Sequence, residues 1–383
     1  MIFISDNKSL REFCEKVSAS SDFITVDTEF IRERTYWSEL CLIQVGGENC
    51  AAAIDATASG IDLTPIFNLM LNSSITKVFH AARQDLEIFA QLMGKLPSPV
   101  FDTQIFAMVC GFGDSIGYDA LVYSLTRKKI DKSMRYTDWR RRPLSKKQLE
   151  YALSDVTYLR VVYEKLRETL AQNGRAGWVA EEMQTLTNKS TYYPDPMESW
   201  RKLKIRSLKP RFILILREIA AWREIEAQRR NVPKNRVIRD EGLVEIAAQA
   251  PKDESALKAL RSMRNEKLRG EPLEVLLKAI KHGQELPEKY CPVIPNRTNR
   301  LQNMEGTREL IKVLLKHCSE KHGVAQKLIS TSEEIEMIIS DPNAKIRPLL
   351  GWRRELFGQF AVSVLRGEIA LTATGSNIKL VTL

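Results

Sequence analysis

The sequence predicts a mixed β-sheet flanked by helices, followed by two small modules built only of helices. Over residues 1–195, short apolar runs rich in β-branched residues alternate with stretches of helical periodicity. Beyond these residues the pattern contains no convincing strand. At 383 residues and 44% apolar content, the chain is long enough for two or three domains. We therefore expect domains at residues 1–195, 205–285 and 295–375.

Five apolar runs, flanked by Gly or Asp, are expected to form the strands of this sheet. They lie at residues 23–27, 41–45, 50–54, 77–80 and 99–101. Helical periodicity predicts helices at residues 9–18, 83–93, 103–110, 118–125 and 145–172. The last of these begins at Ser145, and Gln148 three positions later completes a capping box.

The second half of the chain has a different, all-helical pattern. Polar, Pro-marked residues 187–196 end the alternation, and a second Pro-rich break falls at residues 286–296. Helices are expected at residues 210–230, 242–250, 254–263, 272–282, 307–322, 332–339 and 351–366. A Leu-Arg-Gly tripeptide occurs at residues 268–270 and again at 365–367, where we expect glycine to close a helix. Two helical modules of similar length follow from this pattern.

Composition narrows the class of protein. The net charge of +10 and the pI near 9.2 favour a polyanionic partner, nucleic acid being the commonest. An acidic membrane surface and simple solubility are the alternatives. Six irregularly spaced cysteines without a CxxC pair predict reduced thiols, and four histidines are poor material for a transition-metal site. No apolar run reaches membrane length, and the N-terminus does not look like a signal peptide. We expect a monomeric, soluble, cytoplasmic protein.

Carboxylates in three separate segments suggest a metal site. Asp27 and Glu29 are two positions apart on a predicted strand, so they point to the same face. Such acids at the end of an apolar strand are costly unless a cation neutralises them. The alternative is that the strand ends at Asp27 and both acids are solvated. Asp85 is expected in the first turn of the helix that follows His80, where an acid also favours the helix dipole.

Tyr151 and Asp155 complete the set. Four residues apart on a helix, they share one face, about 6 Å apart along the axis. A surface tyrosine beside a solvated acid is the alternative. Together Asp27, Glu29, Asp85 and Asp155 can hold two Mg²⁺ or Mn²⁺ ions, which suits phosphodiester hydrolysis. The Tyr151 hydroxyl would orient the attacking water.

Three segments resemble the motifs of the DEDDy-type 3′–5′ exonucleases, and specifically those of the ribonuclease D family. They are Val-Asp-Thr-Glu-Phe at residues 26–30, His-Ala-Ala-Arg-Gln-Asp at 80–85, and Tyr-Ala-Leu-Ser-Asp-Val-Thr-Tyr-Leu at 151–159. Residues 40–44, 101–104 and 137–144 agree, while residues 221–237 and 351–357 resemble parts of the two HRDC domains that follow the nuclease in that family. The resemblance implies an RNase H-like (DnaQ-like) exonuclease domain and two small all-α HRDC domains.

The resemblance also implies roles for the site residues. Asp27, Glu29 and Asp155 would bind the cation that activates water, and Asp27 and Asp85 would hold the second. Tyr151 would position the nucleophile, and Glu29 would also meet the terminal 3′ hydroxyl. Asp102 has a different expected role, as an N-cap of the next helix.

Several further residues are candidates for contact with nucleic acid. Basic residues on the first helical module suit phosphate contact without sequence readout, a solvated basic face being the alternative. Phe30 is a candidate for stacking on terminal bases, with core packing as the alternative. His80 is a candidate for contact with nucleic acid, with a satisfied, partly buried histidine as the alternative. Trp222 and Trp352 are expected in the cores of the modules. The basic candidates are Arg229, Arg230, Lys234 and Arg236.

The function predicted from these features is an exoribonuclease that trims the 3′ ends of tRNA precursors and other structured RNAs, releasing 5′-mononucleotides. A DNA 3′–5′ exonuclease is the alternative within the same class, because single-stranded ends differ only in the 2′ hydroxyl and the bases. A catalytically inactive RNA-binding module is the alternative from a different class. Four converging acids argue against it, since binding alone does not need them.

Overall fold

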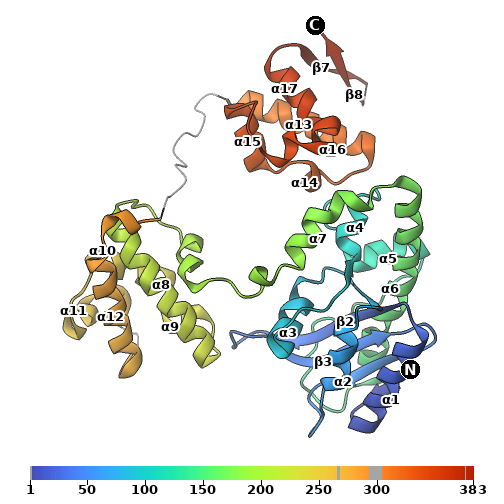
Figure 1. Ribbon diagram of the computed structural model, residues 1–383, viewed down its shortest axis with the longest axis horizontal. Coiled ribbons are helices and arrows are strands. Elements are labelled where there is room, and N and C mark those ends of the chain that lie inside the picture. Colours follow the sequence, from blue (N-terminus) through green and yellow to red (C-terminus); the bar gives the residue numbers. More distant parts are fainter. Residues whose placement is uncertain (1, 265–267, 293–303, 376) are drawn as a thin grey trace. The chain divides into compact units, whose positions relative to one another are not determined.

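The computed structural model describes residues 2–264, 268–292, 304–375 and 377–383, which fall into two compact units. Unit 1 comprises Met1–Glu29, Leu42–Thr187 and Arg297–Leu383, and unit 2 comprises Phe30–Cys41 and Asn188–Asn296 (Figure 1). Our domain boundaries stay predictions, and the one at residue 295 lies outside the described residues. Within the described ranges, no helix combines the length and apolarity that a bilayer span requires.

A six-stranded mixed sheet forms the centre of the N-terminal part of unit 1. Its strand order is β1-β4-β3-β2-β5-β6. Strands β2, β5 and β6 run parallel, β1 is parallel to β4, and β4 is antiparallel to β3. The bounds are β1 Ile2–Ile4, β2 Phe23–Ile31, β3 Glu39–Gly46, β4 Ala51–Asp55, β5 Thr76–Phe79 and β6 Val100–Asp102. The five predicted strands are confirmed, and β1 is an additional edge strand.

Helices pack around this sheet at the five predicted places, and α2 is an additional helix that was not predicted. They are α1 Asn7–Ser20, α2 Thr64–Leu71, α3 Arg83–Met93, α4 Thr103–Ala107, α5 Tyr118–Thr126 and α6 Lys146–Asn173. The capping box of Ser145 and Gln148 is present at the start of α6. Helix α6 packs on β4 and β5 (Figure 1). Its buried Leu159 and Leu166 join Val78 and Leu121 in one hydrophobic cluster, so the long helix is fixed against the sheet.

The C-terminal helices of unit 1 share a hydrophobic core with helices of its N-terminal part. Met108 and Leu170 lie in one buried cluster with Ile311 and Leu314. Trp352 stacks on Trp178 with 4.4 Å between ring centroids, and both rings pack against this shared cluster. The elements are η1 Ala176–Val179, α7 Ala180–Leu186, α13 Glu305–His322, α14 Gln326–Ile329, α15 Ser332–Ser340, η6 Arg347–Leu349, α16 Gly351–Arg353, η7 Arg354–Gly358 and α17 Gln359–Leu365.

A β-hairpin closes the chain and corrects the expectation that no strand follows residue 196. Strands β7 Ile369–Thr374 and β8 Asn377–Thr382 pair antiparallel. Leu371 and Leu380 face each other and pack on the hydrophobic cluster of the C-terminal helices. Most other hairpin side chains are exposed, so the apolar signal of each strand was too weak to stand out.

Unit 2 is the first helical module together with the stretch Phe30–Cys41. Its elements are η2 Lys189–Thr191, η3 Pro196–Lys202, α8 Pro210–Arg230, α9 Lys234–Val237, α10 Asp240–Gln249, α11 Glu254–Ala259, η4 Arg261–Met263, α12 Glu271–Glu285 and η5 Glu288–Tyr290. Trp222 is buried in its core, as predicted. Helix α12 packs on α8 at Gly283, where a Cβ atom would lie 2.6 Å from the Ile215 Cα. Gly270 begins α12 instead of closing a helix, so that prediction was wrong; Gly367 does follow α17.

Candidate active site

Strand β2 carries the first two acids. It continues to Ile31, so the alternative that the strand ends at Asp27 is wrong. Asp27 and Glu29 alternate with the buried Thr28 and therefore point to the face opposite to it. Residues 23–26, of which Phe23, Ile24 and Val26 are apolar, are buried ahead of them, so the core fixes the register that presents both carboxylates.

Helix α6 brings Asp155 to the same place, and hydroxyl groups hold its backbone there. Tyr118 Oη donates to the carbonyl oxygens of Ser154 and Asp155, at 3.0 and 2.8 Å. Thr25 Oγ1 on β2 donates to the Val156 carbonyl at 2.7 Å. These bonds fix the position of Asp155 relative to β2, because they hold the helix backbone at Asp155 and at the residues before and after it.

One carboxylate oxygen from each of Asp27, Glu29 and Asp155 lies within 4.8 Å of the other two. Burial, and then repulsion from Asp155, raises the pKa of Asp27 well above its usual range. Burial and the neighbouring acids raise the pKa of Glu29 to about 10. Burial also raises the pKa of Asp155 to about 7, against the hydrogen bond from Tyr151 and the charge of Arg135. Such a half-buried set of hard oxygen donors fits a divalent cation.

Asp85 lies beside this group without belonging to it. It is 7% exposed in the first turn of α3, and Thr28 Oγ1 donates to its Oδ1 at 2.5 Å. Burial, followed by repulsion from Asp27, raises the pKa of Asp85 well above its usual value. Asp85 is therefore near enough to Asp27 for the charges of the two carboxylates to interact.

Tyr151 lies one helical turn before Asp155 and is half-buried. Its ring is 6.2 Å from that of the buried Trp139, between centroids. Burial, and then the charges of Asp155, Glu29 and Asp27, raises the pKa of the Tyr151 phenol above its ordinary value. The hydroxyl thus stays protonated and donates to Asp155.

Asp102 is a positioning residue that the sequence analysis recognised only as an N-cap. It does cap α4, accepting from the Gln104 amide at 2.8 Å. Its oxygens also accept from the amides of Ala81 and Ala82, at 3.0 and 2.8 Å. Ala81 has φ 58°, a left-handed conformation that costs a non-glycine residue about 1–2 kcal/mol. Asp102 therefore holds the strained turn from which α3 presents Asp85.

His80 makes contacts typical of a satisfied, partly buried histidine. Its Nδ1 lies 2.9 Å from Thr103 Oγ1 and its Nε2 lies 3.1 Å from the Ile116 carbonyl oxygen. Burial lowers the pKa of its imidazole, which favours the neutral ring. Phe30 is a half-buried residue near the end of β2.

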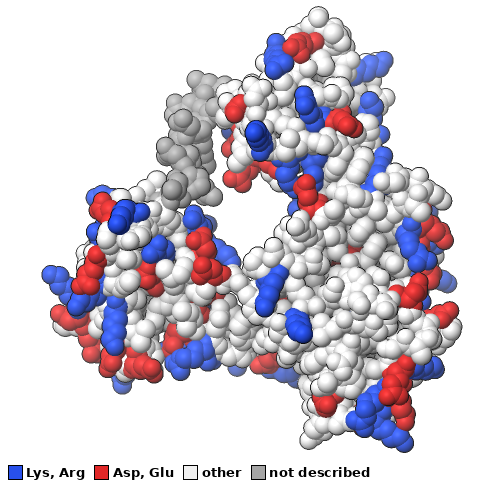
Figure 2. All heavy atoms as spheres, in the orientation of Figure 1, with Lys and Arg blue, Asp and Glu red and all other residues white. Residues whose placement is uncertain are grey.

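Three of the four basic candidates on the first helical module are engaged in ion pairs. Arg229 and Arg230 both pair with the buried Glu226. Lys234 pairs with Glu224, whose carboxylate also accepts from Tyr36 Oη. Lys and Arg side chains alternate with Asp and Glu over the face drawn in Figure 2. This pairing lowers the positive charge available to a phosphate, whereas Arg236 is exposed.

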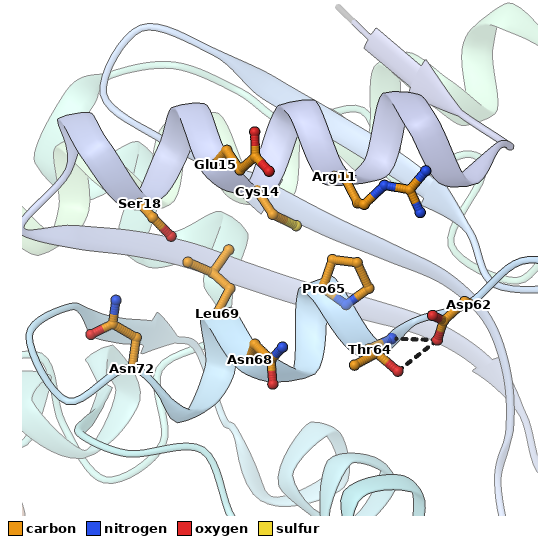
Figure 3. A pocket seen from close by; sticks show the side chains of 10 residues that line it. All are labelled: Arg11, Cys14, Glu15, Ser18, Asp62, Thr64, Pro65, Asn68, Leu69 and Asn72. Carbon is orange, nitrogen blue, oxygen red and sulfur yellow. Dashed lines mark hydrogen bonds between the residues drawn. The ribbon is translucent and has the colours of Figure 1, made fainter.

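A groove of about 520 Å³ between α1 and α2 is a separate feature (Figure 3). Its lining mixes charges of both signs, with Arg11, Glu15 and Asp62, and Asp62 accepts two hydrogen bonds from Thr64. None of the acids of β2, α3 or α6 lines it, so it is not part of the acidic site.

The sheet topology and the acids on β2, α3 and α6 define the class of 3′–5′ exonucleases. A family profile described as 3'-5' exonuclease matches residues 1–171, and one described as HRDC domain matches residues 214–280. The ribonuclease D of Granulibacter bethesdensis is 45% identical over 99% of this chain and 96% of its own length. That of Acidiphilium cryptum is 44% identical over 100% and 97%. The chain belongs to the ribonuclease D family, and it is a 3′–5′ exoribonuclease.

A solved structure agrees with this assignment. The crystal structure of Escherichia coli RNase D, described as an exoribonuclease involved in structured RNA processing, has a TM-score of 0.77 and 30% identity to this chain. The match covers 95% of this chain and 98% of that one. The similarity therefore includes the helical region as well as the nuclease part.

Removing one acid should stabilise the metal-free protein and abolish hydrolysis. Carboxyls whose pKa is raised on folding bind more protons when folded, so the metal-free chain loses stability as pH rises from about 4 through the raised values. Asp27→Asn should raise the free energy of unfolding in chelator at pH 8 by about 0.5–2 kcal/mol. It should also weaken stabilisation by Mg²⁺. Urea melts with chelator and with Mg²⁺ measure both effects. Asp62→Asn, an exposed control, should neither raise the free energy of unfolding in chelator nor weaken stabilisation by Mg²⁺. A lower free energy of unfolding for Asp27→Asn in chelator would contradict the assignment of Asp27 to a metal site.

Loss of one Asp102 oxygen should weaken activation by metal. In Asp102→Asn an amide N–H₂ replaces one acceptor, and the turn before α3 loosens. We expect the Mg²⁺ concentration for half-maximal rate to rise about 10-fold, as for other groups behind metal ligands. Adding Ala81→Gly should recover part of this loss, because glycine adopts positive φ without strain. Ala81→Gly alone should resemble the parent. No rescue in the double variant would reject the role of Asp102 in holding Ala81.

Proposed function

We propose that this exoribonuclease trims the 3′ ends of structured RNAs, above all tRNA precursors, using two divalent cations, Mg²⁺ or Mn²⁺. The observation that carries the proposal is the convergence of three half-buried carboxylates within 4.8 Å. Asp27, Glu29 and Asp155 would hold one cation, and Asp27 and Asp85 the other. When bound, such ions supply water activation and charge stabilisation at the leaving 3′ oxygen.

The chain's own residues orient the reactants. The Tyr151 hydroxyl, which donates to Asp155, would accept a hydrogen bond from the attacking water and so orient it. Water attacks the terminal phosphorus, the bond to the 3′ oxygen of the preceding nucleotide breaks, and a 5′-mononucleotide leaves. Glu29 would meet the terminal 3′ hydroxyl, which favours cleavage from the 3′ end.

The helical region supports a structured substrate. Residues 214–280 match the HRDC profile, and we propose that residues 305–365 are a second module of this kind. In both, a long helix ends in a left-handed residue, Asn231 or Gly323, and a four-residue helix follows, α9 or α14. A further helix, α10 or α15, comes next. This shared order of elements is stronger support than the tripeptide repeat.

The setting of the protein is also a proposal. All six cysteines are free thiols, in keeping with a reducing cytoplasm. The monomeric state expected from the sequence stays a prediction.

The proposal is tested with a tRNA precursor that carries a single-stranded 3′ extension. With a 5′ label, the product should shorten one nucleotide at a time; with a 3′ label, a mononucleotide should appear first. Chelator should stop both, and Mg²⁺ or Mn²⁺ should restore them. Internal fragments, or faster digestion of a DNA of matched sequence, would overturn the proposed activity or the proposed substrate respectively.

Tyr151→Phe separates water positioning from metal binding. The variant keeps the ring that packs near Trp139 and loses only the hydroxyl. We expect kcat to fall about 100-fold, within the range for groups that manage protons and water. The Mg²⁺ dependence should stay unchanged. Tyr123→Phe, on the exposed face of α5, is the control; equal rates for both variants would remove Tyr151 from the mechanism.

A further inference from the structure

The loop between α5 and α6, residues 127–145, is strongly basic. Eight of its residues are Lys or Arg and only two are Asp. The loop leads directly into the helix that carries Tyr151 and Asp155. The basic candidates predicted from the sequence lie on the first helical module, where three of the four are paired, and none of them lies in this loop.

The second half of this loop is firmly anchored. Arg142 donates to both oxygens of Asp55, at 2.7 and 2.6 Å, and to the Trp139 carbonyl at 2.6 Å. Trp139 is 2% exposed, with its ring near that of Tyr151. The Thr137 hydroxyl accepts from Gln148 in the first turn of α6. These contacts tie the loop to β4 and to α6, so the residues just before them are held in a defined place.

Those residues are Arg135 and Tyr136, and they are presented to solvent. Arg135 N donates to the Lys132 carbonyl at 3.1 Å, and Thr137 N to the Met134 carbonyl at 3.2 Å, so both residues lie in hydrogen-bonded turns. Tyr136 is 88% exposed, more than any other large apolar or aromatic side chain in the described part of the chain. The Arg135 guanidinium lies 5.3 Å from the centre of the Tyr136 ring.

Arg135 differs from its basic neighbours in how its charge is used. Lys132 pairs with Asp119, and Arg140 with Asp138. Across the described residues, no ion pair within 4 Å involves Arg135. Its charge lowers the pKa of Asp155 and Glu29, so its field reaches the acidic site.

We infer that Arg135 and Tyr136 hold the single-stranded 3′ end of the substrate, Arg135 contacting a backbone phosphate and Tyr136 stacking on a base. The inference rests on the proposed function, because it requires the strand to enter the acidic site. A phosphate approaching four carboxylates is repelled, and a cation beside them offsets that repulsion. A ring paired with a guanidinium is a stacking platform that accepts any base. This contact therefore grips the strand without reading its sequence.

The test is steady-state hydrolysis and binding of a short single-stranded RNA. Tyr136→Ala and Arg135→Ala should each raise KM about 10-fold with little change in kcat, in line with the loss of one stacking or phosphate contact. Anisotropy in chelator should show a similar loss of affinity. In Arg135→Ala the slope of log K against log salt should become less steep by about 0.7.

Matched variants separate contact from damage to the loop. Tyr136→Trp should bind like the parent, because stacking needs only a ring. Arg11→Ala removes the same charge from α1 and should change nothing. Parent-like KM and affinity in both alanine variants, or an alanine-like Tyr136→Trp, would overturn the inference. A parent protein that binds RNA through these residues without hydrolysing it would support the contact and reject the proposed function.

Discussion

Repulsion among buried carboxylates is the constraint on which this structure depends. Asp27, Glu29 and Asp155 hold their oxygens within 4.8 Å of one another, and Asp85 lies alongside. Like charges at that distance oppose each other by several kcal/mol at the dielectric of a protein surface. Without a cation the acids reduce this repulsion by binding protons, as their raised pKa values show, and when ionised they push their elements apart. The fold must therefore supply the free energy that keeps β2, α3 and α6 together.

That free energy comes from apolar burial behind the acids and from hydrogen bonds beside them. Thr25 and Tyr118 hold the backbone of α6 from two sides, and Thr28 holds the Asp85 carboxylate. Asp102 fixes the turn before α3 through backbone amides. Apart from Thr28, which binds one oxygen of Asp85, these groups act on the backbone beside an acid and leave its carboxylate oxygens free for the proposed cations. A hydroxyl neutralises no charge, which leaves that task to the metal.

The sequence predicted the elements that have local signals and missed those that depend on distant partners. Helices α3 and α8 have the predicted bounds, because local signals set their ends. Gly94 ends α3, Pro210 begins α8, and Asn231 ends α8. The acids of the site were predictable, since an apolar strand and a helix face fix their directions. The hairpin β7–β8 was not, because its stability comes from the cluster under it.

The extra role of Asp102 was also beyond the sequence. Its capping of α4 is local, whereas the amides of Ala81 and Ala82 lie about twenty positions earlier in the chain and meet it only across the sheet. The pairing of Arg229 and Arg230 with Glu226 is the opposite case. Spacings of three and four on α8 carried that signal, and it was available in the sequence.

The repulsion among the carboxylates also bears on which basic side chains can contribute to binding a polyanion. A net charge of +10 does not by itself say where a polyanion binds, because Arg229, Arg230 and Lys234 in the helical unit each pair with a nearby acid. A basic side chain without an ion-pair partner is the better indicator of where a phosphate binds. Beside a cluster of carboxylates, such a cation serves two purposes: it lowers their mutual repulsion and it attracts a phosphate that they would repel. Arg135 is such a cation: it has no ion pair within 4 Å in the described part of the chain, and its charge acts on Asp155 and Glu29. The basic loop before α6 therefore complements the charge of the acidic site.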